Sequence, residues 1–105
     1  MSNLMQNLDS SIQVTMSSIE IVDFINTFRK ADSETLLRHD NFMAKVPKVL
    51  GENYAPKFLG TQNYGNNNTR YIYNLPKREA CLMAMSYSYE IQAAVFDRMT
   101  ALEDA

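Results

Sequence analysis

The chain has little of the chemistry on which disulfide-stapled, metal-binding and nucleotide-binding proteins depend. Its 105 residues include one Cys, one His, three Gly and no Trp. The single Cys81 excludes an internal disulfide, and Cys81 with His39 is too small a ligand set for a zinc site. Three glycines, at positions 51, 60 and 65, provide no glycine-rich phosphate loop. We therefore predict that the protein holds no cofactor and no metal.

Catalytic and membrane patterns are also missing from the sequence. No paired carboxylates and no nucleophile triad can be recognised, so we predict that the protein is not an enzyme. No apolar run approaches the roughly 20 residues of a membrane span, and residues 1–9 lack the basic start and apolar middle of a signal peptide. One cysteine suits a reducing compartment. Together these absences predict a cytoplasmic protein without membrane contact.

The length and composition predict one small globular domain. Apolar residues make up 46% of the chain, which is ordinary for a folded protein. A chain of this length can bury about two thirds of its surface around one modest core. Residues 1–11 are polar and irregular. We interpret them as a flexible N-terminal arm and residues 12–105 as the single domain.

Charge is distributed unevenly along the sequence. Residues 29–78 carry nine Lys or Arg and four acids, whereas residues 79–105 carry five acids and only Arg98. A basic centre between acidic flanks is typical of a nucleic-acid face or of a charge-steered protein interface. The net charge of −2 and the pI near 5.3 argue against strong, general affinity for nucleic acid.

Periodicity and turn residues predict an α+β fold: two N-terminal helices, a wing-like β-hairpin with a short N-terminal strand, and two C-terminal helices. Ser17 and Glu20 have the spacing of a capping box, which marks the first helix. Pro47 predicts an end or kink in the second helix. The predicted elements are a strand at 12–16, helices at 18–30 and 33–46, a short helical turn at 47–50, strands at 57–62 and 69–75, a helix from 76, and a helix at 89–102.

The second predicted helix has an apolar face and a polar face. We expect the apolar face to join the core through Leu36, Leu37, Phe42, Met43, Val46, Val49 and Leu50. For the last helix we expect a buried stripe of Ile91, Val95, Met99 and Leu102, widened by Ala94 and Phe96.

The polar face of the second helix, with the hairpin, is the predicted binding surface. In a winged arrangement the second helix enters a groove of DNA and the hairpin touches the backbone. The alternative interpretation is a solvated polar face, with His39 as a hydrogen-bonded structural residue. The candidate partner-binding residues, for a repressor or for DNA, are Arg38, His39, Asn41, Lys45, Lys48, Tyr64 and Arg70. Among them, Arg38 and Lys45 are expected to contact the partner, and His39 and Asn41 to hold the start of the helix.

Four segments in order resemble phage regulatory proteins of the Rha and antirepressor type. Arg38-His-Asp-Asn41 is similar to the R-H-D-N element of that family, and Met16-Ser-Ser-Ile-Glu20 is similar to the segment that opens its first helix. The stretch 69–79 resembles its strand leading into a helix, and 87–99 resembles its closing helix. The resemblance covers roughly residues 14–103.

This resemblance implies a phage antirepressor in the cytoplasm of a bacterial host. Such a protein binds a phage repressor, prevents the repressor from holding operator DNA, and so promotes prophage induction. The basic centre and the winged arrangement leave open a second interpretation, a sequence-specific DNA-binding regulator of phage transcription. The apolar residues of the last helix exceed what one small core can cover. We therefore also expect a homo-oligomer, either a dimer or a tetramer.

Overall fold

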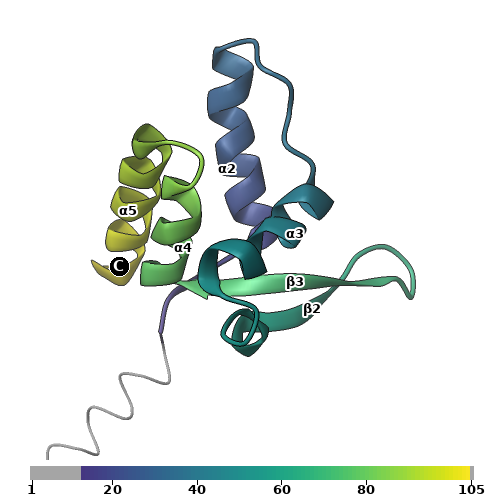
Figure 1. The fold of residues 1–105 in the computed structure, drawn as a ribbon. Helices are drawn as coiled ribbons and strands as arrows, with labels where there is room; N and C mark the ends of the chain where they lie inside the picture. The colour runs from purple at the N-terminus through teal and green to yellow at the C-terminus, as the bar shows by residue number, and fades with distance from the viewer. Residues whose placement is uncertain (1–12, 105) are drawn as a thin grey trace, which may run out of the picture.

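The computed structural model of the chain describes residues 13–104, so the predicted arm at 1–11 lies outside the described residues. The described part combines helices with a small antiparallel sheet (Figure 1), which confirms the predicted α+β class. The elements in chain order are β1 (Thr15–Ser17), α2 (Ser18–Ala31), α3 (His39–Leu50), a 3-10 helix η1 (Ala55–Phe58), β2 (Leu59–Asn63), β3 (Thr69–Pro76), α4 (Lys77–Met85) and α5 (Tyr89–Asp104).

The three strands form one antiparallel sheet in the order β1-β3-β2. Met16 pairs with Leu75, and Leu59 pairs with Tyr73, so β3 is the central strand. The predicted hairpin is confirmed; its loop closes with the Tyr64 amide donating to the carbonyl of Asn68. β2 begins two residues later than predicted, because η1 occupies the preceding positions.

Helix α2 begins and ends with recognisable capping interactions. Its start is the predicted capping box: the Glu20 amide donates to the Ser17 hydroxyl, and the Ser17 amide donates to the Glu20 carboxylate. At its end Ser33 adopts a positive φ of 58°. The amides of Ser33 and Glu34 then bond back to the carbonyls of Lys30 and Arg29, which is a Schellman arrangement.

The second predicted helix was placed too early. We expected it from residue 33, but α3 begins at His39, and residues 34–38 are extended. The Asn26 side chain holds this segment by accepting from the Leu37 amide (2.7 Å) and donating to the Leu37 carbonyl (3.0 Å). Arg29 adds a bond to the carbonyl of Thr35. These contacts from α2 occupy backbone groups that a helical turn would need.

We expected an end or a kink of the helix at Pro47, with a short helical turn at 47–50. The helical conformation of 47–50 is confirmed, but α3 does not end at Pro47. The helix continues to Leu50, where Gly51 at φ 102° closes it with its amide on the Pro47 carbonyl. Proline removes only its own amide donor. Because Pro47 lies in the last turn, α3 loses one hydrogen bond near its end and still continues for three more residues.

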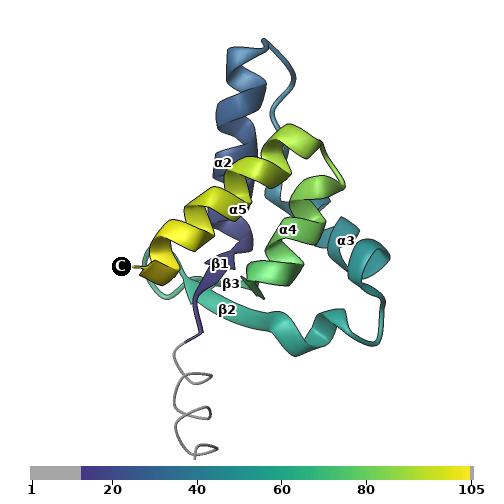
Figure 2. The ribbon, with the colours of Figure 1, turned by 90° about the vertical axis from the view of Figure 1, so that its left-hand side faces the viewer.

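The core lies where α2 and α4 pack on β1 and β3, with α5 packed on α4 and α2, and α3 contributing from one side (Figures 1 and 2). The predicted stripe of Ile91, Val95 and Met99 is buried, but Leu102 and Phe96 are 41% and 49% exposed. In α3 and the segment before it, Phe42 and Val46 are fully buried, whereas Leu36 and Val49 are exposed. Leu36 faces solvent because it precedes the helix rather than belonging to it.

Phe42 is the largest fully buried side chain, and its ring stacks on Tyr87 with centroids 6.1 Å apart. We predict that Phe42→Ala lowers the free energy of unfolding by about 3–5 kcal/mol, because it loses apolar burial and leaves a cavity. Leu36→Ala, at a position 47% exposed, is the matched control and changes stability little. Denaturant unfolding of both variants measures the difference; similar stabilities would place Phe42 outside the core.

Candidate functional site

The structure divides the predicted contact residues of α3 into an outward group and an inward group. Arg38, Asn41 and Lys48 are exposed, whereas His39 and Lys45 are partly buried. Asn41 and Lys48 are seven residues apart, about two helical turns, so they lie on the same side of α3. The outward group thus remains available to a partner, and the inward group has contacts within the domain.

Arg38 lies just before the first turn of α3 and is anchored there by its neighbour. Its Nε and Nη2 donate to the two carboxylate oxygens of Asp40 at 3.1 and 3.0 Å. The hydrogen bond and charge of Arg38 lower the pKa of Asp40, so that carboxylate stays ionised. The Arg38 side chain is 75% exposed. Because Asp40 occupies only Nε and Nη2 of the guanidinium, the remaining nitrogen of Arg38 is free to donate to a partner.

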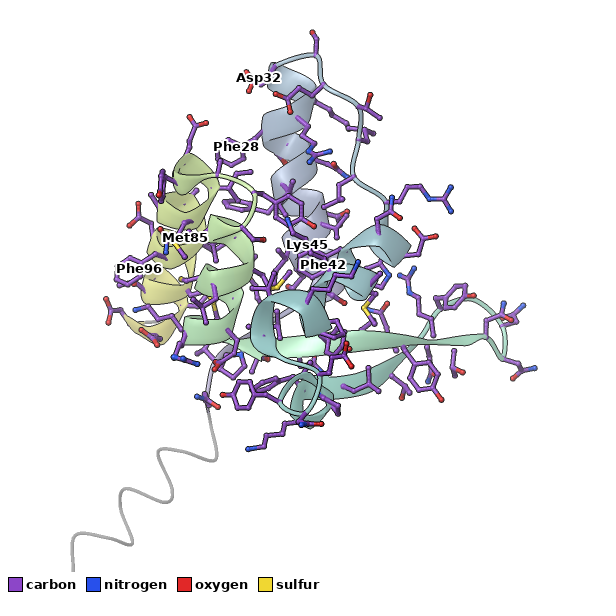
Figure 3. All side chains as sticks on the ribbon, in the orientation of Figure 1. Phe28, Asp32, Phe42, Lys45, Met85 and Phe96 are labelled. Atoms are coloured by element: carbon purple, nitrogen blue, oxygen red, sulfur yellow. The ribbon has the colours of Figure 1, made fainter. Side chains whose placement is uncertain are left out.

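Lys45 was expected to be a free contact residue, but it connects α3 to the turn between α4 and α5. Its Nζ donates to the carbonyl of Ser86 at 3.0 Å and lies 3.7 Å from the ring centroid of Tyr87. Burial, with the nearby charge of Arg29, lowers the pKa of Lys45. Figure 3 shows Lys45 beside Phe42 on α3. Lys45 is therefore a structural residue.

His39 joins three elements through one hydroxyl group. Its Nε2 lies 2.8 Å from the Oγ of buried Ser18, at the start of α2, and the same Oγ accepts from the amide of Tyr73 in β3 at 3.0 Å. Burial disfavours the charged imidazole and lowers the pKa of His39, and the charge of Arg70 adds to this effect. The expectation that His39 holds the helix start fits this geometry.

Asn41 does not share that structural role. It is exposed on the first turn of α3, where its amide group faces solvent. An exposed carboxamide contributes little to stability but offers both a donor and an acceptor. Asn41 is thus better suited to contact a partner than to hold the helix.

The hairpin carries the remaining two predicted residues in one arrangement. Arg70 donates through Nε and Nη2 to the Gln62 side chain at 3.1 and 2.9 Å, and its guanidinium lies 4.8 Å from the ring centroid of Tyr64. Gly65 and Asn67, with φ of 65° and 60°, shape the tip. The charge of Arg70 contributes to the lowered pKa of His39, and Figure 1 shows the start of α3 above the hairpin strands. The structure therefore brings the hairpin and the start of α3 together.

One feature of this region was missed in the sequence, the exposure of Tyr71. Tyr71 and Tyr73 are two residues apart on β3 and so share a face of the strand, but Tyr73 is buried and Tyr71 is 67% exposed. Among residues 13–104, no helix covers the part of the sheet near the hairpin tip (Figure 1). Alternation alone cannot show where the cover ends, so Tyr71 is an additional candidate contact.

A buried carboxylate elsewhere in the domain has a structural explanation. Glu79 accepts from the Tyr54 hydroxyl and from Arg78 Nη1, each at 2.7 Å. Burial alone would raise the pKa of Glu79, but these hydrogen bonds outweigh it and the pKa is lowered. The ionised carboxylate thereby ties the segment before η1 to the first turn of α4.

Within residues 13–104 no group of three or more His, Cys, Asp or Glu side chains is placed to hold a metal ion. In the same range no helix is both long and apolar enough to cross a membrane. Comparisons of the chain with protein-family models, with curated proteins and with solved structures found no match.

We predict that Lys45→Ala lowers the free energy of unfolding by about 1–2 kcal/mol, because it removes a charge-assisted hydrogen bond and a cation–π contact. Arg38→Ala is the control. It removes only a solvent-exposed ion pair and should melt like the unmodified protein. Thermal unfolding followed by circular dichroism compares the two; equal melting temperatures would contradict the structural role of Lys45.

His39 also predicts a pH dependence of stability. Its pKa is lower in the folded state than its ordinary value of 6.5, so the unfolded chain binds a proton first as pH falls. Stability is therefore complete above the unfolded pKa and decreases below it, from about pH 6.5 downward. Unfolding titrations between about pH 7.5 and 5.5 should show this loss in the unmodified protein but a smaller one in His39→Gln. A parallel loss in both would assign the effect to other groups.

Proposed function

We propose that this protein is a phage regulator of transcription of the Rha and antirepressor type, and that it binds operator DNA through α3 and the β2–β3 hairpin. The observation that carries the proposal is that exposed donors on α3 lie beside a hairpin whose own donor, Arg70, is partly buried. Arg38, Asn41 and Lys48 line the outward side of α3, and Arg70 with Tyr64 occupies the neighbouring hairpin.

The order of elements supports a winged-helix mode of binding. The chain runs β1, α2, α3, β2, β3, and the sheet order β1-β3-β2 places the hairpin beside the helix pair. In helix-turn-helix proteins the second helix lies in the major groove. Here that position belongs to α3, and the hairpin extends beyond the helices (Figure 1), where it can reach the adjacent backbone.

Each residue of the surface has a chemically distinct contact to make. The ammonium group of Lys48 suits a phosphate as a point charge. The carboxamide of Asn41 can bond the two groups that adenine presents in the major groove. Arg70 is held by Gln62 and by the ring of Tyr64, and it could contact the backbone or the minor groove.

The net negative charge of the chain limits nonspecific binding to DNA but does not prevent specific binding through α3 and the hairpin. The acids gather on α5, which carries four acids and Arg98, on the far side of the domain from the hairpin (Figure 1). A net charge of −2 reduces attraction to any phosphate backbone. Specific contacts must then provide much of the affinity, as suits a protein that selects one operator.

The antirepressor activity that the resemblance implies was the first expectation from the sequence and is here the second candidate; the acidity of α5 favours it. Glu90, Asp97, Glu103 and Asp104 are all exposed on this helix. Repressors hold operators with basic surfaces, because they must neutralise phosphates. An acidic helix is complementary to such a surface and can compete with DNA for it.

The DNA-binding proposal predicts different effects for two exposed α3 residues. DNA selected from a random pool, followed by gel shift, should yield a preferred sequence near physiological salt. Asn41→Ala should lose about tenfold in affinity for that sequence and relax the preference at one base pair. Lys48→Ala should weaken binding to all DNA sequences alike. It should also reduce the slope of log affinity against log salt concentration by about one.

Lys30→Ala is the matched control, since Lys30 is exposed at the far end of α2. It should bind like the unmodified protein. Two results together would contradict DNA binding and support the antirepressor. The protein would select no DNA sequence, and both it and its Asn41→Ala variant would release operator DNA from a purified phage repressor.

A further inference from the structure

The outer face of α4 and α5 carries an apolar groove that the other described residues, within 13–104, do not cover. Its floor is formed by Cys81 and Leu82 from α4 and by Gln92 and Phe96 from α5, and its volume is about 480 Å³. We call it the α4–α5 groove. Figure 2 shows the two helices side by side at the surface, and Figure 3 shows Phe96 pointing away from the domain.

Phe96 is held in its exposed position. Its ring is 49% exposed, and the ammonium group of Lys77 lies 4.2 Å from its centroid. Lys77 is in turn fixed by Glu103 at 3.0 Å. Burial raises the pKa of the Cys81 thiol, so Cys81 stays neutral and belongs to the apolar floor. Positioned apolar side chains in a groove with polar edges are typical of a protein contact.

The two edges of the groove carry opposite charges. The α4 edge has Lys77 and Arg78, which pair within the chain with Glu103 and Glu79. The Arg78 side chain is still 72% exposed, so its guanidinium can also meet a carboxylate from outside. The α5 edge has Asp97, which is also exposed. A surface with a basic edge and an acidic edge is complementary to itself when a two-fold axis exchanges the edges.

Only one simple two-fold axis brings these charges together. One possible axis runs parallel to the helices, between the α4–α5 pairs of the two copies. It packs α4 of one copy antiparallel on α5 of the other, with residues at the same level along the helices in contact. Arg78 then faces Asp97 of the partner subunit, twice. An axis perpendicular to the helices packs α4 on α4 and places Arg78 opposite the Met85 end of the partner's groove, without a charge pair.

We propose that a second copy of this chain covers the α4–α5 groove, with α4 of each copy antiparallel to α5 of the other. In this contact two helices from each copy pack face to face around the two Phe96 side chains. It leaves α3 and the hairpin free, since they lie on the other side of the domain (Figure 1). The dimer therefore does not depend on the proposed DNA-binding function.

Sedimentation equilibrium tests the contact with Phe96→Ser and a matched control. The unmodified protein should sediment as a dimer of the 12.0 kDa chain. Phe96→Ser should raise the dissociation constant at least about tenfold, because central aromatic anchors dominate interface energy. Leu36→Ser, with similar exposure on the opposite side of α2, should leave the dimer unchanged.

Charge reversal tests the direction of the axis. Arg78→Asp alone and Asp97→Arg alone should each weaken the homodimer, because each places like charges in contact twice. An equal mixture of the two variants should form a heterodimer, in which both contacts again join opposite charges. Circular dichroism of each variant shows that it is folded before mixing.

Three results would overturn the proposal. The first is an unmodified protein that remains a 12.0 kDa monomer at about 100 μM. The second is a dimer that neither Phe96→Ser nor the charge reversals weaken. The third is a mixture of folded variants that does not restore association. If Phe96→Ser loses repressor or DNA binding but keeps its oligomeric state, the groove binds another partner. That result would also contradict the dimer.

Discussion

The Ser18 hydroxyl group connects the parts of the domain on which the candidate surface depends. It accepts from the Tyr73 amide in β3 and lies 2.8 Å from His39 Nε2 at the start of α3. Ser18 is fully buried, so loss of either hydrogen bond would leave a buried polar group with neither a protein partner nor water to bond to. Three elements therefore share one hydrogen-bonded junction, and it sets where the exposed stripe of α3 begins relative to the hairpin.

Cationic residues of the central segment have two different roles that their sequence positions do not distinguish. Lys45 packs on Tyr87 and bonds to the Ser86 carbonyl, whereas Lys48, less than one turn later, faces solvent. Arg70 is held by Gln62 and Tyr64 close to α3. The basic character of residues 29–78 thus divides into charges that hold the fold and charges that remain for a partner.

Local signals explain which elements were predicted well. The capping box of Ser17 and Glu20, the Asn- and Gly-rich turn, and the Ile91, Val95 and Met99 stripe act within a few residues, and the structure confirms all three. The start of α3 was predicted wrongly because Asn26, eleven residues before Leu37, holds the chain extended. Exposure of Phe96 and Leu102 was also missed, since apolar periodicity does not show how wide a face the domain covers.

The sequence by itself determined the secondary structure class, the turn of the hairpin and the candidate donors of α3, because these follow from side-chain chemistry and short-range spacing. Only the tertiary structure decided which donors remain free. Lys45 and His39 meet partners 41 and 21 residues away, Ser86 and Ser18. Tyr71 is exposed because no helix reaches the hairpin tip, and Phe96 is exposed because α5 has only one covered side. Such contacts depend on packing between distant segments, which residue spacing along the chain does not encode.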